Sequence, residues 1–241
     1  METRTALVTG AAQGLGHEFA VALAGRGYRV AGLDLVPQPE TAGKVLDYLE
    51  LTADVTDEAQ VRQALERVID RFGTLHILVN NAGVYPSSPF EDTTPEDWRR
   101  VMRVNLEAPF LVTQAALPYL KAAGWGRIVN IVSAAVLTAP PTMVAYVTSK
   151  MGLIGFTRSL ASALGPCDIT VNAIAPSMVR TATAERTVGA DGGFEHVRAQ
   201  QAVPRTQLPS DLVSTLLYVV DEGSGFLTGQ TLNVSGGSAY L

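Results

Sequence analysis

The chain has 241 residues, of which 47% are hydrophobic and 17% charged, and 18 Lys and Arg against 23 Asp and Glu leave a net charge of -5. This length and apolar content suit one α/β domain with a substantial core, so we expect a single domain over residues 1–241. The slight excess of acid provides no basic surface for nucleic acid or anionic lipid, and we expect neither partner.

Two further classes of protein are disfavoured by residue usage. Cys167 is the only cysteine, and the three histidines are scattered, so we expect neither an intrachain disulfide nor a bound metal. Residues 1–4 lead into the first apolar run without a basic leader or a long apolar segment, which predicts a cytoplasmic protein.

Apolar, β-branched runs alternate with segments of helical period along the chain. Buried strands are predicted at residues 5–9, 29–33, 77–80, 127–132 and 169–173. Residues 57–72 begin with an acidic turn and carry apolar residues at helical spacing, so they predict an amphipathic helix. This alternation implies right-handed βαβ crossovers and a Rossmann-like, doubly wound α/β fold, with helices on both faces of a parallel sheet.

Ligands in this architecture bind at the carboxyl ends of the strands. Residues 181–205, which are rich in Gly, Ala and charge, interrupt the alternation after a strand. We therefore expect them to form a mobile lid over the site.

A glycine-rich turn, TGAAQGLG at residues 9–16, follows the first strand and leads into a helix. Glycines allow a tight turn and close approach to a pyrophosphate, whose charge the helix N-terminus would stabilise. The same glycines could simply permit close packing of helix on strand, since this spacing alone is a weak signal. The contacts expected for a dinucleotide are Gly10, Gln13, Gly14, Leu15 and Gly16.

The second strand is followed by Asp34, close to the spacing at which an acid binds an adenosine ribose. Its carboxylate can accept hydrogen bonds from both ribose hydroxyls and would repel a 2′-phosphate, and the flanking Gln13 and Leu35 are neutral. The sequence therefore predicts NAD rather than NADP. A surface aspartate ending a strand is the plainer alternative.

Two more strand ends fit the same crevice. Asp54 and Val55 follow the third strand, where a carboxylate could bind the adenine amino group, and Asn81, Ala82 and Gly83 follow the fourth. Ordinary turn chemistry explains either group equally well, because Asn, Asp and Gly are common in turns.

The chemically most useful residues are Ser133, at a strand end, and Tyr146 and Lys150, which share one helix face four residues apart. A neighbouring ammonium and an oxidised nicotinamide would favour the phenolate, so we expect the pKa of Tyr146 to fall towards neutral pH. Tyr146 would exchange the proton of an alcohol while hydride moves to or from the nicotinamide, and Ser133 would donate a hydrogen bond to the same oxygen. Lys150 would also hold the nicotinamide ribose. Each residue alone could serve packing or solvation.

These motifs together resemble the short-chain dehydrogenase/reductase family over essentially the whole chain. The matching positions, in the family's order and spacing, are residues 9–16, Asp54, residues 80–83, Asn105, Ser133, Tyr146, Lys150 and residues 176–181. The resemblance implies that Asn105 holds a water linking Lys150 to solvent. It also implies that Pro176, Met178, Val179 and Thr181 lie beside the nicotinamide, and that the protein is a homotetramer, with helices around 106–120 and 147–164 pairing across subunits.

One position departs from the family pattern, because Ser177 follows Pro176 where glycine is usual. Serine is less free at positive φ, so this loop could differ slightly. Within the family, residues 34–37, 81–86 and 175–183 resemble the (S)-1-phenylethanol dehydrogenase branch, which also carries the serine.

The residues expected to border the substrate are mostly apolar and include no Arg or Lys placed to bind an anion: Tyr85, Ala135, Val136, Leu137, Pro140, Met143, Met178 and Val179. We therefore expect an NAD-dependent oxidoreductase acting on an apolar or aryl secondary alcohol or ketone. A 3-oxoacyl-thioester reductase, or another carbonyl reductase of the family, is an alternative. A dinucleotide-sensing protein without catalysis is an alternative of another class. The physiological substrate, its enantiomer, the direction of reaction and the pathway are not determined by the sequence.

Overall fold

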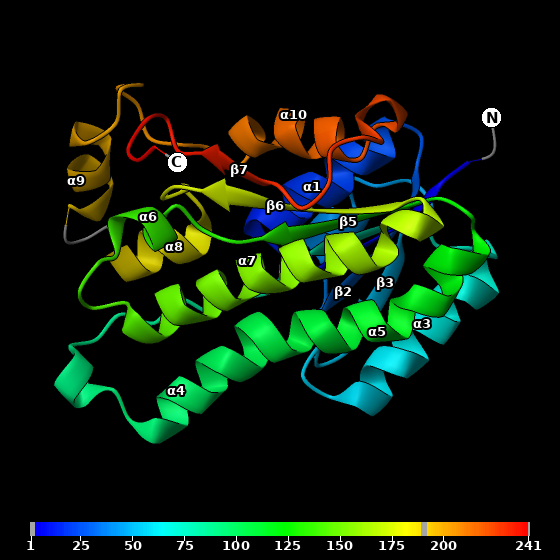
Figure 1. Cartoon of the computed structure of the whole chain (residues 1–241), viewed down its shortest axis with the longest axis horizontal. Coiled ribbons are helices and arrows are strands. Elements are labelled where there is room, and N and C mark those ends of the chain that lie inside the picture. The colour runs from blue at the N-terminus through cyan, green and yellow to red at the C-terminus, as the bar shows by residue number, and fades with distance from the viewer. Residues whose placement is uncertain (1–2, 189–191, 241) are drawn as a thin grey trace.

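The computed structural model describes residues 3–188 and 192–240. At its centre lies a seven-stranded sheet in the order β3-β2-β1-β4-β5-β6-β7, in which every neighbouring pair is parallel (Figure 1). The strands are β1 (Thr5–Thr9), β2 (Arg29–Asp34), β3 (Leu49–Thr52), β4 (Ile77–Asn80), β5 (Gly126–Ile131), β6 (Ile169–Pro176) and β7 (Thr231–Val234). The strand order reverses between β1 and β4, so the predicted doubly wound fold is confirmed.

All five predicted strands are present. Strands β1 and β4 have the predicted bounds, β2 and β6 run further, and β5 is shifted by one residue towards the N-terminus. The five predicted ranges do not include β3, which was expected only as a strand before Asp54, or β7, because both are short edge strands with mostly half-buried residues. Such a strand lacks the continuous apolar run of the central strands.

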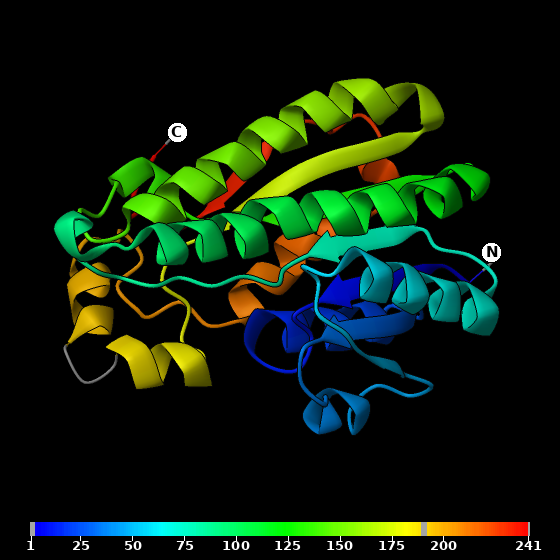
Figure 2. The same ribbon diagram turned by 90° about the horizontal axis from the view of Figure 1, so that it is seen from below.

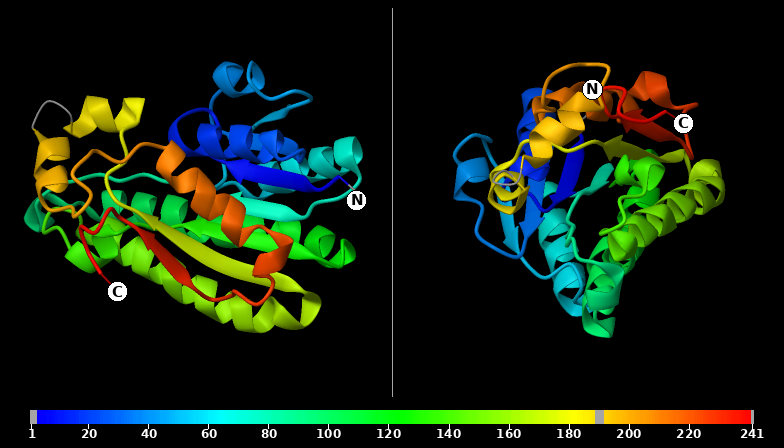
Figure 3. Two further views of the ribbon diagram at one scale, coloured as in Figure 1. Left: turned by 90° about the horizontal axis from the view of Figure 1, so that it is seen from above. Right: turned by 90° about the vertical axis from the view of Figure 1, so that its left-hand side faces the viewer.

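Helices cover both faces of the sheet (Figure 3). Helices α1 (Gly14–Gly25) and α10 (Ser210–Val219) pack on one face, and α3 (Glu58–Phe72), α5 (Ala108–Ala122) and α7 (Val144–Leu164) pack on the other. The shorter helices are α2 (Pro39–Ala42), α4 (Pro95–Met102), α6 (Ala135–Thr138), α8 (Ala182–Val188) and α9 (Gly193–Ala199), with 3₁₀ turns at Phe90–Asp92, Gly165–Cys167 and Glu222–Ser224. Each face thus has its own core.

The predicted helix at 57–72 is confirmed as α3. The Asp57 side chain caps it by accepting hydrogen bonds from the main-chain N–H groups of Ala59 and Gln60. Gly73 ends it in the left-handed conformation, with φ 79°.

A π-helical turn, η2 (Arg103–Glu107), joins α4 to α5 so that the three form one long rod beside α7, as Figure 2 shows from below. A π turn is wider than an α-helical turn and often occurs at a functional site. Asn105 lies in this turn.

Helices α6, α8 and α9 lie beyond the carboxyl end of β6 (Figure 1), at the edge where a ligand is expected. The predicted lid segment 181–205 therefore contributes α8 and α9, although its residues 189–191 lie outside the described residues. Its mobility stays a prediction.

Candidate active site

The glycine-rich turn meets the start of α1 at the carboxyl edge of β1. Gly10 and Gly14 have φ of 67° and 59°, which favours glycine. Within the part of the chain that the structure describes, no side chain caps α1, since Gln13 at its N-cap makes no capping hydrogen bond. Free main-chain N–H groups at a helix start fit a phosphate, so the predicted dinucleotide is compatible with this turn.

The glycines also serve packing. A Cβ on Gly16 would lie 2.0 Å from the Gly10 carbonyl oxygen, so only glycine fits there. A Cβ on Gly14 would lie 3.3 Å from Thr181 Cγ2, which places the start of the lid directly over the turn. The half-buried Leu15 side chain packs against the core beneath α1. Both interpretations of these glycines are therefore supported, at different positions.

Asp34 is fixed by the same turn. Its Oδ2 accepts a hydrogen bond from the Ala12 main-chain N–H at 2.9 Å, and its Oδ1 accepts one from Val36 N–H at 3.2 Å. The neighbouring Leu35 side chain is exposed. None of the ion pairs found among the described residues involves Asp34, so no cation neutralises it.

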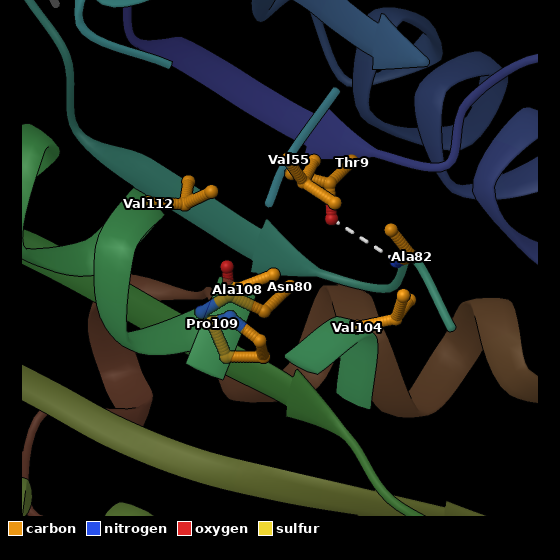
Figure 4. Close-up of a pocket in the computed structure, with 8 residues that line it drawn as sticks. All are labelled: Thr9, Val55, Asn80, Ala82, Val104, Ala108, Pro109 and Val112. Atoms are coloured by element: carbon orange, nitrogen blue, oxygen red, sulfur yellow. Dashed lines mark hydrogen bonds between the residues drawn. The ribbon is translucent and has the colours of Figure 1, made fainter. Parts of the chain in front are cut away.

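Asn81 ties the fourth strand to the glycine-rich turn, since its Nδ2 donates to the carbonyls of Thr9, at 2.9 Å, and Gly10, at 3.2 Å. The main-chain N–H groups of Asn81 and Ala82 both donate to Thr9 Oγ1. Figure 4 shows the hydrogen bond from Ala82 to Thr9, beside a small crevice that Val55 also borders. Asp54 behaves as a turn residue, because its Oδ1 accepts hydrogen bonds from Thr56 N–H and Thr56 Oγ1 at 2.8 Å each.

Ser133, Tyr146 and Lys150 come together at the end of β5 and the start of α7. The Ser133 hydroxyl lies close enough to the Tyr146 hydroxyl to lower its pKa. Lys150 is only 4% exposed, and its Nζ lies 5.8 Å from the centre of the Tyr146 ring and donates to the Ile131 carbonyl at 2.8 Å. The spacing of four residues thus places both side chains on one face of α7, as predicted.

The direction of the Tyr146 pKa differs from our expectation. Burial raises this pKa, the Ser133 hydroxyl lowers it, and the nearby Tyr85 raises it again. Burial also lowers the pKa of Lys150 to about 8. The protein's own groups therefore raise the phenol's pKa, because burial disfavours both charged forms. The lowering of this pKa by an oxidised nicotinamide stays a prediction.

Asn105 is fully buried and uses its side chain within the protein. Its Nδ2 donates to the Val84 carbonyl at 2.8 Å and to Ser149 Oγ at 3.1 Å, and its Oδ1 accepts from Val84 N–H at 2.8 Å. A Cβ on Gly83 would lie 3.2 Å from Asn105 Oδ1 and 3.5 Å from Lys150 Nζ. A side chain at position 83 would therefore contact Asn105 tightly and lie against Lys150.

The loop after β6 runs from Pro176 towards α8. The Pro176 carbonyl accepts a hydrogen bond from Ala134 N–H at 2.7 Å, beside Ser133, and Thr181 Oγ1 accepts one from Ala184 N–H in α8. Ser177 is not among the residues with positive φ, so the departure from the family's glycine causes no strain. Met178 is half-buried, whereas Val179 is buried in the core.

Tyr85 connects the catalytic residues to the lid. Its ring lies edge-on to Tyr146, with the ring centres 6.5 Å apart, and Thr187 and Thr181 lie close enough to its hydroxyl to lower its pKa. Arg186 of α8 lies close enough to influence the pKa of Tyr85, which burial raises. The expectation that no Arg or Lys is placed to bind an anion stays a prediction, although α8 brings Arg186 near Tyr85.

The other predicted pocket residues belong to α6 and to the turn before α7. Ala135, Val136, Leu137, Pro140 and Met143 are all half-buried. Val136 also packs against a small core cluster, so part of its surface faces away from the crevice. Hydrogen bonds from Ser88 N–H and Ser87 Oγ to Thr142 join this wall to the loop that carries Tyr85.

Comparison with known proteins identifies the family. A family model described as short chain dehydrogenase matches residues 4–191. The chain belongs to this family. A trans-4-hydroxycyclohexanecarboxylate dehydrogenase of Sinomonas cyclohexanicum is 36% identical over 97% of this dehydrogenase and 92% of its own length.

Two similar solved structures contain different nicotinamide cofactors. An actinorhodin polyketide ketoreductase with NADPH has a TM-score of 0.94 at 30% identity, covering 99% of this dehydrogenase and 98% of the other chain. A 3-ketoacyl-(acyl-carrier-protein) reductase from Brucella melitensis complexed with NADH has a TM-score of 0.93 at 28% identity, covering 99% of both chains. This dehydrogenase is thus an oxidoreductase that acts on an alcohol or ketone with a nicotinamide dinucleotide.

The described residues contain neither a membrane span nor a metal-binding cluster. Among residues 3–188 and 192–240, no helix is long and apolar enough to span a membrane, and no cluster of His, Cys, Asp and Glu could hold a metal. A cytoplasmic location stays a prediction from the sequence. The sequence did not indicate Gln207, whose side chain joins the loop at Ser177 to the end of β7, because nothing local in its sequence distinguishes it.

Proposed function

We propose that this protein is an NAD-dependent dehydrogenase that interconverts an apolar or aryl secondary alcohol and its ketone. The observation that carries the proposal is the close approach of the half-buried Ser133 and Tyr146 to the buried Lys150, at the sheet edge where Asp34 and the glycine-rich turn also lie. The nicotinamide, when bound, supplies or accepts the hydride. The rest of the chemistry falls to the chain.

In the direction of reduction, Tyr146 would give its proton to the forming alkoxide while Ser133 donates a hydrogen bond to the same oxygen. In oxidation, Tyr146 would take the proton from the alcohol. Lys150, whose pKa burial lowers to about 8, would stabilise the phenolate and hold the nicotinamide ribose. Because burial raises the pKa of Tyr146, a proton lost to the substrate would return readily.

Asn105 would take part through its main chain. Its side chain is already bonded to Val84 and Ser149. The π turn alters the main-chain hydrogen-bonding pattern at this position, so we assign the main-chain carbonyl, rather than the amide side chain, to holding a water that leads from Lys150 to solvent.

NAD is the proposed cofactor because Asp34 would meet the adenosine ribose without a neutralising cation. Its carboxylate can accept hydrogen bonds from ribose hydroxyls, and it would repel a 2′-phosphate. Ala12 and Val36 orient it through main-chain N–H groups. We further assign Gly10, Gln13, Gly14, Val55, Ala82, Asn81, Gly83, Pro176, Met178 and Thr181 to the dinucleotide, and place Asp54 at its adenine.

The substrate class rests on the half-buried apolar wall of α6 and Met143, closed by the Tyr85 ring. A relative that is a trans-4-hydroxycyclohexanecarboxylate dehydrogenase supports a ring-bearing alcohol. Likeness to the (S)-1-phenylethanol dehydrogenase branch points the same way. We also propose that residues 181–205, with α8 and α9, close over this substrate as a lid of the single domain.

One observation favours a second candidate, a 3-oxoacyl-thioester reductase. Arg186 lies near Tyr85 and could attract the anionic carrier of such a substrate. The similar Brucella melitensis reductase is complexed with NADH, so the cofactor does not separate the two candidates.

A second copy of the chain would cover the groove between α4, η2, α5 and α7, and on this basis we propose the homotetramer. The groove has a volume of about 650 Å³ and is lined by Trp98, Arg99, Met102, Arg103, Leu106, Glu107, Phe110 and Phe156. Phe110 is 44% exposed, and an apolar face of this kind favours association. Phe110→Asp should weaken this association, so that light scattering shows a lower molar mass for the variant than for the wild-type protein.

The decisive experiment is NADH oxidation with aryl ketones, cyclic ketones, sugars and 3-oxoacyl thioesters, repeated with NADPH. We expect turnover of the apolar ketones and at least about a tenfold preference for NADH, or 1.4 kcal/mol. A similar preference for NADPH would overturn the assignment of Asp34. Preference for the thioesters would establish the second candidate, and tight NADH binding without turnover of any compound would indicate a sensor.

A further inference from the structure

Gln207, between α9 and α10, is a buried residue that contacts two segments, the loop after β6 and the end of β7. It is 6% exposed. Its Oε1 accepts a hydrogen bond from Ser177 N–H at 2.9 Å, and its Nε2 donates one to the Val234 carbonyl at the end of β7 at 2.6 Å. Its own carbonyl accepts from Arg180 N–H at 2.8 Å, and it forms an isolated parallel bridge with Val179.

These contacts join both ends of the lid segment. Ser177 and Arg180 lie just before residues 181–205, and Gln207 lies just after them. One residue therefore holds the chain where it enters the lid and where it leaves it. Ser177 also follows Pro176, whose carbonyl is bonded to Ala134 beside Ser133, so a movement of this loop would reach the catalytic serine.

The segment that carries Gln207 is itself anchored. Arg205 makes two hydrogen bonds to the Asp211 carboxylate, at 2.6 and 2.7 Å, and Leu208 N–H donates to the same carboxylate at 2.8 Å. Asp211 lies in the first turn of α10, which packs on the sheet. Gln207 thus transmits the position of a rigid helix to the loop after β6.

We propose that Gln207 is a positioning residue that sets the loop 176–181 against the dinucleotide. This inference rests on the proposed function for the location of the nicotinamide, but the hydrogen bonds that define it do not. An amide is required because Gln207 must accept from Ser177 and donate to Val234 at the same time.

The variant Gln207→Glu tests this requirement through pH. A protonated glutamic acid can make both hydrogen bonds, whereas a carboxylate can only accept and would face the Val234 carbonyl oxygen at close range. The charged residues on the adjoining segments are Arg180, Arg205 and Asp211, and Thr231–Val234 of β7 carries none. The loop should therefore be held in the variant at acidic pH and released as pH rises.

Gln201→Glu is the matched control. Gln201 also donates to a carbonyl just after β7, that of Ser235 at 3.3 Å, but within residues 3–188 and 192–240 its side chain makes no hydrogen bond to the loop 176–181. Both variants change an amide to an acid near the same strand end, so an effect of charge alone would appear in both.

The experiment measures the dissociation constant of NADH by fluorescence and the hydrogen exchange of residues 176–181, across mildly acidic to mildly alkaline pH. For Gln207→Glu we expect NADH binding to weaken by about tenfold or more between these limits, with loss of exchange protection in the loop. Wild type and Gln201→Glu should show neither change. Thermal unfolding at each pH shows whether the fold as a whole is retained.

The proposal would be overturned if the NADH dissociation constant varied with pH in the same way for Gln207→Glu and Gln201→Glu. It would also be overturned if Gln207→Glu lost NADH binding only at pH values where the whole protein unfolds. A wild-type protein that binds neither NADH nor NADPH would instead overturn the proposed function. Hydrogen exchange would then still decide whether Gln207 holds the loop.

Discussion

Asp34 and Asn81, at the nucleotide end of the site, both make hydrogen bonds to the glycine-rich turn. At the catalytic end, burial instead raises the pKa of Tyr146 and lowers the pKa of Lys150, so that the charged form of each side chain is disfavoured. The first arrangement satisfies polar groups with main-chain partners and needs no ligand to be stable. The second disfavours both the phenolate and the ammonium. The nucleotide end is thus already ordered by hydrogen bonds within the protein, whereas the charged side chains of the catalytic end are electrostatically unfavourable. We therefore expect the catalytic end to be the part of the site whose activity lowers the stability of the fold.

The largest effect should come from removing the phenol at the catalytic end. Tyr146→Phe deletes the hydroxyl that lies beside Ser133, so proton transfer to the ketone is lost, and kcat should fall by about 10³-fold. The dissociation constant of NADH should change little, because the nucleotide end is intact. Tyr119→Phe on α5 is the control and should retain activity in the same ketone assay. Wild-type turnover by Tyr146→Phe would refute the assigned role.

Lys150→Met should separate stability from activity. The pKa of Lys150 is lowered from 10.5 to about 8, which corresponds to about 3 kcal/mol of cost for the buried ammonium. Losing the hydrogen bond to Ile131 offsets about 1 kcal/mol of the gain, so the variant should be about 2 kcal/mol more stable at neutral pH and inactive.

The sign of the pH dependence follows from the lowered pKa. The cost is fully present below about pH 8 and disappears as pH rises towards the unfolded pKa of 10.5, because only the unfolded lysine still binds the proton in that interval. The advantage of Lys150→Met should therefore shrink at alkaline pH in urea unfolding. Lys121→Met, on the exposed end of α5, should change nothing. A less stable Lys150→Met at neutral pH would contradict the argument.

At the nucleotide end, Asp34→Ser should shift the preference between cofactors. Without the carboxylate, the repulsion of a 2′-phosphate is gone, so the ratio of kcat/KM for NADPH over NADH should rise by about tenfold, or 1.4 kcal/mol. The hydrogen bond from Ala12 N–H can be kept by the serine hydroxyl, so folding should be preserved. Asp70→Ser, on the exposed side of α3, is the control. An unchanged ratio would mean that Asp34 does not meet the ribose.

The same comparison explains what the sequence could predict. The central strands and the pair Tyr146 and Lys150 were predictable because their spacing along one element fixes their placement. The direction of the Tyr146 pKa was not, because it depends on burial by packed elements. The position of Arg186 over Tyr85 depends on how α8 folds back, and the contacts of Gln207 join Ser177 to Val234, far apart in sequence. Neither leaves a local pattern.

The smallest expected effect concerns backbone strain at Ala139, in the wall of the proposed substrate pocket. Ala139 follows α6 with φ 45° and ψ 61°, a left-handed conformation that is unfavourable for alanine. Ala139→Gly should therefore raise the free energy of unfolding by up to about 1 kcal/mol, measured in urea. Ala123→Gly is the matched control, since Ala123 ends α5 with φ -69° and ψ -17°, where glycine brings only an entropic cost. If both substitutions destabilise the protein equally, no strain is stored at Ala139, and the unfavourable energy of the catalytic end lies in its buried charges alone.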